Sequence, residues 1–384
     1  MATGNELVTF DMAKAMYEKL DGEIDVLAGV TRVASWADVQ AIVRAGLAAK
    51  FFSIGDQFTC QRDGVDMVWD VIGFDHDTPA DPRFTHSMTL QLHDVYKNLQ
   101  FDAREAFYYA ETGLAAGTYH FTIGAHNWVS GDIGKTAQFT LSSALPAGGQ
   151  LVFNQAHNAS VVGATVSAYA SATDTAAIET VTLTEGNGGT SLGEINNVRQ
   201  SALNSMQRAL LGNNNYRESA VRQWLNSGAA AGSVWTPQNV WDRPPSWAST
   251  EKGFQNGLDA DFLAVVDNVT KTTAEDNLND GSGSYTTTET FFLVSREEVF
   301  AGKENGQDEG GAYAYYSRQS DLSGAGTGAD SNRIKYLNGV ESVWWLRTPH
   351  STFGHNARSA DATGMVKSSY ANYDSGVAPT CNIM

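Results

Sequence analysis

The sequence predicts an α+β fold that is interrupted by an all-β module. Apolar residues recur at helical spacing in residues 35–47 and in parts of 194–270, whereas residues 103–190 consist almost entirely of short alternating runs. The 384 residues include 37 glycines and only 18% charged residues, a composition typical of chains rich in sheet and turns. This length accommodates two or three domains.

Residues 1–50 are expected to form a short helical leader. Asp11 could cap a first helix, and Ser35, followed three residues later by Asp38, predicts a second helix that continues to Leu47. Such a leader has little core of its own, so we expect it to dock on a neighbouring element or on a second copy of the chain. It is the candidate element for attachment or oligomerisation.

The hydrophobic period changes from helical to alternating at Phe51. Two alternating runs, residues 58–61 and 67–72, flank Asp63-Gly64, a dipeptide typical of hairpin turns. Residues 51–102 are therefore expected to open the main domain with a β-hairpin, which a loop at residues 73–83 follows.

Residues 103–190 predict a compact β-sandwich or jelly-roll module. Alternating runs are separated by turn signals about every ten residues, as in small sandwich domains. The clearest runs are residues 117–123, 137–141, 150–153 and 179–183. Because the pattern changes again after residue 190, we expect this module to be an insertion.

Residues 191–384 return to mixed patterning. Helices are predicted at residues 197–211, at 218–225 with Asn215 as the cap, and after Asp259. A Thr-rich strand is predicted at residues 285–294, and a capping box formed by Ser295 and Glu298 predicts one more helix. Residues 301–340 form a long Gly- and Asp-rich connection, which is typical of a functional segment or of one held by specific contacts.

The charge balance excludes several classes of function. Acidic residues outnumber basic ones by 43 to 25, giving a formal net charge of −18, which disfavours nucleic-acid binding. The sequence has no apolar run of 18 residues, so we expect no membrane insertion. The N-terminal residues lack a signal-peptide pattern, which predicts synthesis in the cytoplasm without Sec export.

Motifs for metals, cofactors and catalysis fail at specific positions. Leu278 and Thr287 replace required ligands of a calcium loop that begins at Asp276. The glycines at 324–328 lack dinucleotide-binding spacing, and the histidines include no His-x-x-x-His pair. Two cysteines are too few for a disulfide scaffold or a four-Cys zinc site. We therefore expect no cofactor, no metal and no catalytic residues.

Residues 344–384 combine a fixed frame with a filling of unusual composition. Trp344-Trp-Leu-Arg347 precedes the filling, and Gly376-Val-Ala-Pro379 follows it. Between them the chain is rich in Tyr, Ser, Gly, Asn and His, as antibody paratopes are. A solvated surface loop has a similar composition, so composition alone leaves both interpretations open.

Four motifs in this order resemble a known family. Residues 215–226, 257–266, 291–298 and 343–347, closed by 376–379, resemble a C-type-lectin-fold domain common in phages and prophages of gut bacteria. That family is similar to the formylglycine-generating-enzyme branch of the fold and to the variable proteins of diversity-generating retroelements. The resemblance covers about residues 50–102 and 190–384. It implies a C-type-lectin fold into which residues 103–190 are inserted.

The resemblance also implies a ligand face. In retroelement-diversified relatives, adenine-directed mutagenesis rewrites the stretch after Trp-Trp-Leu-Arg, and products of mutated Asn codons dominate this filling, with Met365 and Lys367 as exceptions. The implied scaffold consists of Trp344, Trp345, Arg347, Arg358 and Gly376. The implied ligand-binding residues are His350, Thr352, Phe353, His355, Asn356, Ser359, Asp361, Ser368, Ser369, Tyr370, Asn372 and Tyr373.

The enzyme branch of the fold oxidises its substrate through a reactive cysteine pair. The resemblance places Cys60 on the opening strand and Cys381 on the closing strand, which pair in this fold, so we expect the two thiols to lie close together. Neither cysteine has a pocket-like sequence context. We therefore do not expect an enzyme.

The function that the resemblance implies is host recognition by a phage or prophage protein of the virion, for example of its tail. Its partners would be a host-cell surface protein or glycan, other virion proteins, and further copies of the chain, with a trimer as the candidate oligomer. Two alternatives remain open: a structural virion or surface-display protein without diversified binding, and a carbohydrate-active enzyme.

Overall fold

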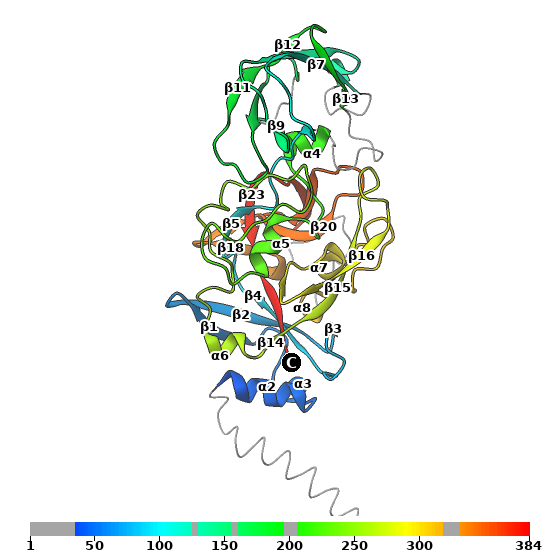
Figure 1. Ribbon diagram of the computed structural model, residues 1–384. Helices are drawn as coiled ribbons and strands as arrows, with labels where there is room; N and C mark the ends of the chain where they lie inside the picture. The colour runs from blue at the N-terminus through cyan, green and yellow to red at the C-terminus, as the bar shows by residue number, and fades with distance from the viewer. Residues whose placement is uncertain (1–34, 125–129, 155–159, 196–205, 318–330) are drawn as a thin grey trace, which may run out of the picture.

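The computed structural model describes residues 35–124, 130–154, 160–195, 206–317 and 331–384, which form a mixed fold of many strands and a few short helices. The molecule is elongated (Figure 1): the β module lies at one end, a main body carries the remaining sheets, and the first described helices lie at the other end. The helix that Asp11 could cap lies outside the described residues.

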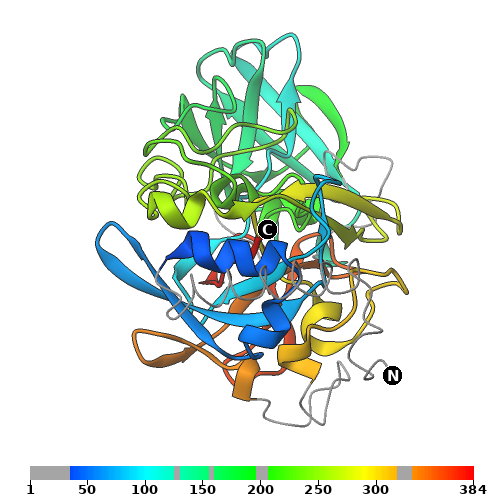
Figure 2. The same ribbon diagram turned by 90° about the horizontal axis from the view of Figure 1, so that it is seen from below.

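The predicted Ser35-capped helix is confirmed. It is α2 (Trp36–Arg44), in which the Ser35 hydroxyl accepts a hydrogen bond from the Asp38 N–H. Its apolar side packs into the main core, and Gln40 donates to the carbonyl of Met384 at 2.6 Å. Figure 2 shows α2 crossing the end of the main body beside the C-terminus. A second short helix, α3 (Ala48–Phe51), follows it.

The first sheet joins the opening and closing parts of the main body. The predicted hairpin is confirmed, and Asp63 and Gly64 at its turn both have positive φ (55° and 77°), as a type I′ turn requires. The C-terminal strand β24 lies inside this sheet. In spatial order the strands are β1 (Gln57–Arg62), β2 (Val65–Phe74), β4 (Met88–Leu92), β24 (Thr380–Ile383) and β14 (Val266–Asp267), and β17 (Phe291–Phe292) also pairs with β24.

The expected pairing of the two cysteine strands is wrong. Strands β2 and β4 separate β1, which carries Cys60, from β24, which carries Cys381. Both cysteines are free and buried in one core, where their thiols interact electrostatically, and the Trp69 indole N–H donates to the Cys60 sulfur. Strand β4 pairs with β2 on one side and with β24 on the other, so the two cysteine strands cannot be neighbours.

The filling between the two frame motifs forms two strands of a second sheet. Its hairpin consists of β21 and β22, and β20 and β23 are parallel neighbours. The absence of alternation in the sequence concealed this hairpin. In spatial order the strands are β22 (Val366–Tyr370), β21 (Asn356–Ala360), β20 (Trp344–Pro349), β23 (Asp374–Val377) and β5 (Lys97–Gln100).

The predicted strand at residues 285–294 is in fact two strands in different sheets. Strand β16 (Ser284–Glu289) pairs with β15 (Val269–Ala274), whereas β17 belongs to the first sheet. The predicted loop at residues 73–83 contains the end of β2 and a short strand, β3 (Thr78–Pro79), which pairs with β15. The smallest sheet is the hairpin of β18 (Lys335–Leu337) and β19 (Val340–Ser342).

The helices of the main body are short. The capping box that predicts α7 (Arg296–Phe300) is confirmed, with Ser295 and Glu298 bonded reciprocally. Asn215 does not cap α5 (Ala220–Leu225), because the Ser219 hydroxyl accepts from Arg222 N–H instead. The others are α6 (Ala260–Leu263), which follows Asp259 as predicted, α8 (Ala314–Ser317) and the 3₁₀ turn at Ser331–Arg333.

The β module has two four-stranded sheets and a core of its own. Helix α4 (Met206–Leu211), the described part of the helix predicted at 197–211, packs into this core, and a 3₁₀ turn spans Ser130–Asp132. One sheet contains β11 (Glu179–Thr182), β10 (Thr165–Tyr169), β9 (Gly149–Phe153) and β6 (Tyr108–Ala110). The other contains β12 (Thr184–Glu185), β8 (Thr136–Leu141), β7 (Gly117–Ile123) and β13 (Thr190–Ile195). Strand β5 precedes the module in the sequence and β23 follows it, yet the two strands pair with each other in the main body. The module is therefore inserted between two parts of one sheet.

Candidate ligand-binding face

A buried charge network fixes strand β20 at the start of the candidate face. Arg347 donates two hydrogen bonds to Glu298, at 2.5 and 3.0 Å, and one to the carbonyl of Glu309 at 2.7 Å. Lys271 contacts the same Glu298 carboxylate at 2.5 Å and Asp77 at 2.6 Å. Burial raises the pKa of Glu298, but the charges of Arg347 and Lys271 outweigh it, so the pKa is lowered and the group stays ionised.

Three other expected scaffold residues, Trp344, Trp345 and Gly376, are packed tightly beneath the face. Trp344 and Trp345 are fully buried, and their indole N–H groups donate to the carbonyls of Arg333 and Leu99. At Gly376, an added Cβ would lie 2.6 Å from a Val95 methyl and 2.8 Å from the Val343 carbonyl, so only glycine fits.

Arg358 is half-buried and connects the hairpin to Glu304. Its Nε and Nη2 donate to the two oxygens of that carboxylate at 2.8 and 2.7 Å, and Ser351 N–H donates at 2.9 Å. Burial raises the pKa of Glu304, but Arg358 and Ser351 outweigh it and lower the pKa to about 2. The bidentate Arg358–Glu304 pair holds β21 against the segment that follows α7, and the Ser351 bond holds the loop before β21 against the same carboxylate.

The Glu304 carboxylate predicts a specific loss of stability in acid. Its pKa falls from an ordinary value of 4.5 to about 2 on folding, so its contribution is complete above 4.5 and disappears as the pH falls through about 2. We expect Glu304→Gln to lower the free energy of unfolding by up to about 3 kcal/mol at neutral pH. The difference between wild type and variant should close below about pH 2 in urea titrations. A difference that stays constant with pH would contradict this assignment.

The loop at residues 350–356 is anchored from beneath by Asn214. The fully buried Asn214 amide donates to the carbonyls of Phe353 at 2.9 Å and Asn356 at 3.1 Å. Its backbone N–H and the Arg208 Nε both donate to the carbonyl of Gly354. A loop held at the carbonyls of Phe353, Gly354 and Asn356 is pre-organised, so it loses little conformational entropy on binding a ligand.

We expect Asn214→Ala to destabilise the chain by about 1–3 kcal/mol, because the carbonyls of Phe353 and Asn356 each lose their side-chain donor and the buried Arg208 loses an acceptor. Denaturant unfolding measures this loss, and hydrogen exchange should report faster exchange at residues 350–356. Asn256→Ala is the matched control, because that amide donates to the Gly228 carbonyl, away from the loop. Equal stability of the Asn214 variant and wild type would show that the loop does not depend on this anchor.

Five rings form a continuous row across the loop and the hairpin, which we call the aromatic row. Successive ring centroids are 4.7 Å apart from His350 to Phe353, 5.7 Å to His355, 5.3 Å to Tyr370 and 5.0 Å to Tyr373. Phe353 and Tyr373 are 38% and 48% exposed. Aromatic side chains provide large, rigid contact area at low entropic cost, which suits them to recognition.

The two histidines of the row are neutral at physiological pH. Burial, together with the charge of Arg358, lowers the pKa of His350 to about 4. Burial and the neighbouring His350 lower the pKa of His355 to about 3. The Nδ1 of His350 accepts from the Thr352 N–H at 3.2 Å, as a neutral imidazole can. The row is therefore an uncharged surface on a strongly acidic chain.

The structure corrects the expected ligand face at three positions. His355, Ser359 and Asn372 are buried, so they lie beneath the surface and not on it. His355 is covered by its neighbours in the row and contacts Gln207 of α4 at 3.1 Å. Composition identified these side chains as polar but gave no information about their burial.

The remaining expected residues do not form one patch. The strand register places Ser368 and Tyr370 on the same face as Arg358 and Asn356, whereas Ser369 points to the opposite face. Asp361 accepts hydrogen bonds within its own turn, from Thr363 and Met365. The exposed or half-buried residues around the row are His350, Thr352, Phe353, Asn356, Ser368, Tyr370 and Tyr373.

Sequence reasoning missed the residues that hold this face from below. Asn214 was part of a run of three asparagines that reads as a turn, and Arg208 and Glu304 carried no motif. Arg208 is buried between Asp276 and Asp280, at 3.0 and 2.6 Å. The one signal in the sequence was that Arg208 is a charged residue within an apolar helical pattern, which is typical of a buried ion pair.

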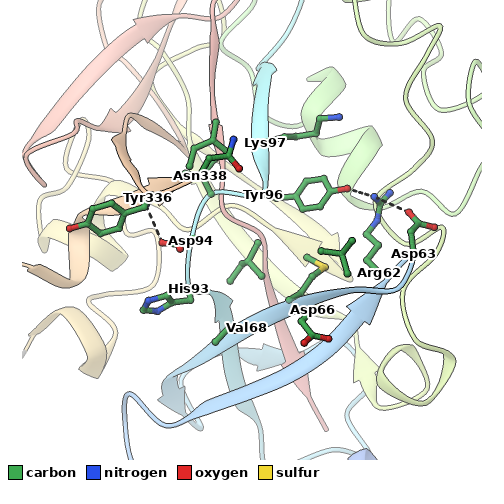
Figure 3. Close-up of a pocket in the computed structure, with 16 residues that line it drawn as sticks. Arg62, Asp63, Asp66, Val68, His93, Asp94, Tyr96, Lys97, Tyr336 and Asn338 are labelled. Atoms are coloured by element: carbon green, nitrogen blue, oxygen red, sulfur yellow. Dashed lines mark hydrogen bonds and ion pairs between the residues drawn. The ribbon is translucent and has the colours of Figure 1, made fainter.

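A second concave region lies between the β1–β2 hairpin and the β18–β19 hairpin (Figure 3), with a volume of about 620 Å³. Its charged groups already have partners. Arg62 donates to the Tyr96 hydroxyl and to the carbonyls of Gly253 and Phe254, and Lys97 pairs with Glu251 at 2.6 Å.

Within the described ranges, no group of three His, Cys, Asp or Glu side chains is arranged to hold a metal ion. In the same part of the chain, no helix is long and apolar enough to cross a membrane.

Part of the chain is similar to a known protein family. Residues 194–384 match the model of a domain of unknown function, DUF6273. The match begins at the end of the β module and includes the aromatic row, its hairpin, Arg347, Glu298 and Lys271, but neither Asp77 nor the β1–β2 hairpin. No curated protein and no solved structure matches the chain.

Proposed function

We propose that the chain is a receptor-binding protein of a phage or prophage, and that the aromatic row is its ligand face. The observation that carries the proposal is a partly exposed, uncharged row of rings on a loop that Asn214 anchors at two carbonyls. A solvated loop without a binding role needs neither contiguous rings nor buried anchors. Recognition surfaces combine both features.

We assign the main body to the C-type-lectin fold. The assignment rests on the ordered sequence motifs, and two features of the topology support it. The C-terminal strand β24 lies in the same sheet as the opening hairpin, and the Trp-Trp-Leu-Arg strand leads directly into the hairpin that bears the ligand face.

The partners of this face are a host-cell surface protein or glycan. A single small face binds modestly, so an oligomer, for example a trimer on a virion, would increase avidity. The net charge of −18 agrees with partners other than nucleic acid. Attachment to other virion proteins is assigned to the N-terminal residues.

The attachment proposal is tested by deletion of residues 1–34. The deletion must stop before α2, because Val39, Ile42 and Val43 belong to the main core. Loss of oligomer formation in size-exclusion chromatography with light scattering, or of incorporation into particles, is the expected result. If both are unchanged, attachment resides elsewhere in the chain.

Retroelement diversification of the face is tested by sequencing. The proposal expects alleles that differ only between residues 350 and 375, and a reverse-transcriptase gene with a near-copy of the 3′ end nearby. Alleles that vary evenly along the chain would contradict retroelement diversification and favour a structural or display protein.

A binding protein fits the cysteines better than an oxidising enzyme does. Burial raises the pKa of the Cys60 thiol to about 12 and that of Cys381 well above its usual range. Thiols of this kind stay protonated at neutral pH and are poor nucleophiles. The carbohydrate-active alternative is tested by incubating the chain with host glycans, where we expect no turnover.

A further inference from the structure

The β module lies next to the sheet that carries β5 and β23 (Figure 1). Residues of both parts line a cleft of about 290 Å³. Both parts of the molecule contribute to its lining: β9 and β10 on one side, β5 and the segment after β22 on the other. The side chains used below are Gln100, Arg104, Tyr169, Arg243, Ser246 and Asn372. We call this region the arginine cleft.

Arg104 brings a positive charge that no carboxylate offsets. Its Nε donates to the carbonyl of Leu210 at 3.0 Å and its Nη1 to that of Asn154 at 2.8 Å, both neutral acceptors. Within the described ranges, no carboxylate lies within ion-pair distance of this guanidinium. By contrast, Arg208, Arg222 and Arg347 each pair with Asp or Glu.

A second guanidinium lines the same cleft. Arg243 lies over the Tyr169 ring at 3.8 Å and donates to Gln150 and to the carbonyls of Ser171 and Asp174. The Asp174 carboxylate offsets part of its charge.

The two acids beside Arg104 in sequence, Asp102 and Glu105, do not neutralise it. Burial, together with repulsion from Asp242, raises the pKa of both carboxyls well above the usual range, which favours their protonated forms. The cleft therefore keeps a net positive charge.

The cleft is continuous with the aromatic row. Asn372 lines the cleft and directly precedes Tyr373, and Gln100 donates to the Asn372 carbonyl at 2.8 Å. Arg104 interacts electrostatically with the Tyr373 side chain. The exposed Tyr373 ring is therefore one residue along the chain from the lining of the cleft.

We propose that the arginine cleft binds the acidic group, a carboxylate or a sulfate, of a saccharide that extends over Tyr373. A guanidinium matches the geometry of such an anion. The inference rests on the proposed ligand face and gives its ligand class. The Ser246 hydroxyl, which donates to Gln100 Oε1 at 3.3 Å, can still accept a hydrogen bond from a sugar hydroxyl, and the Tyr373 ring offers a face for stacking. The volume is near the lower limit of ligand pockets, roughly 300 Å³, which suits one acidic ring better than a peptide.

The test compares glucuronic acid with glucose on the full chain, because the two differ at C6 by a carboxylate in place of a hydroxymethyl group. Ligand-observed saturation-transfer NMR is suited to weak binding. Glucuronic acid should bind at least about tenfold more tightly than glucose, because charge-assisted hydrogen bonds are about twice as strong as neutral ones. Added salt should weaken its binding.

Two variants test the role of the positive charge. Arg104→Gln removes it, and Ser246→Glu places a competing carboxylate at the exposed rim without removing an anchor of the fold. Each should weaken glucuronic acid binding by about tenfold or more. Ser249→Glu is the matched control, because Ser249 is also exposed but lies outside the cleft, so this variant should leave binding unchanged. If Arg104→Gln lowers the melting temperature, Ser246→Glu decides the result.

Three results would overturn the proposal. These are glucuronic acid binding no better than glucose, equal loss of binding in Ser246→Glu and Ser249→Glu, and binding of a hexaglutamate peptide in its place. The last result would assign the cleft to acidic peptides. The proposals for the aromatic row and for the arginine cleft can be contradicted separately. The host-cell adsorption assay tests the row and uses no glucuronic acid, whereas the glucuronic acid assay tests the cleft.

Discussion

Replacement of Phe353, Tyr370 and Tyr373 together by alanine is expected to abolish adsorption of particles to host cells. The three rings supply the accessible part of the aromatic row, and truncating a central aromatic residue of an interface commonly costs about 2 kcal/mol or more. The combined loss of affinity should exceed about a hundredfold. The measurement is the adsorption rate constant of particles that carry wild-type or variant protein.

The effect on binding must be separated from an effect on folding. Tyr370 is half-buried and packs against the core of the β module, so its loss should lower the melting temperature slightly. The double variant Phe353→Ala, Tyr373→Ala should leave the melting temperature nearly unchanged and still lose most adsorption. Val65→Ala with Val340→Ala is the control, because these side chains are 67% and 68% exposed and lie on hairpins outside the row. Unaltered adsorption of the triple variant would exclude the row as the ligand face.

Replacement of Arg347 by alanine is expected to reduce the free energy of unfolding by about 3–5 kcal/mol, the cost typical of breaking a buried ion pair. Arg347 is fully buried, and its removal leaves Glu298 with Lys271 as its remaining cation and three backbone carbonyls without their donor. Denaturant titration measures the change. Strand β20 should lose protection from hydrogen exchange first, and the aromatic row should lose its order with it.

The exposed pair Arg83–Asp81 provides the control for this prediction. Its arginine side chain is 84% exposed, so Arg83→Ala should change stability by no more than about 1 kcal/mol. A similar small change for Arg347→Ala would mean that the network does not hold the frame.

Local signals in the sequence predicted the elements whose determinants lie within a few residues. Ser35 with Asp38 and Ser295 with Glu298 identified two helix starts, and Asp63-Gly64 identified the hairpin turn. Each depends on hydrogen bonds or backbone angles of adjacent residues, which a short stretch of sequence determines. The Asn215 cap failed because Ser219, an equally good cap, stands closer to the apolar run.

Elements that depend on distant contacts could not be predicted in this way. The β21–β22 hairpin has polar residues on both faces, so its sequence shows no alternation. The single strand predicted at residues 285–294 is two strands, because β16 pairs with β15 and β17 pairs with β24. Nothing in the sequence connects Arg347 with Glu298 or Asn214 with the Phe353 carbonyl. For the same reason, His355, Ser359 and Asn372 were expected on the surface although they are buried.

The most direct test of the proposed recognition function is saturable binding of the purified, fluorescently labelled full chain to cells of candidate host strains. We expect wild type and the Val65→Ala, Val340→Ala control to saturate at the same level, and the Phe353, Tyr370 and Tyr373 triple variant to give only background. Equal binding of wild type and the triple variant, or no saturable binding by wild type, would contradict the assignment of the aromatic row as the ligand face.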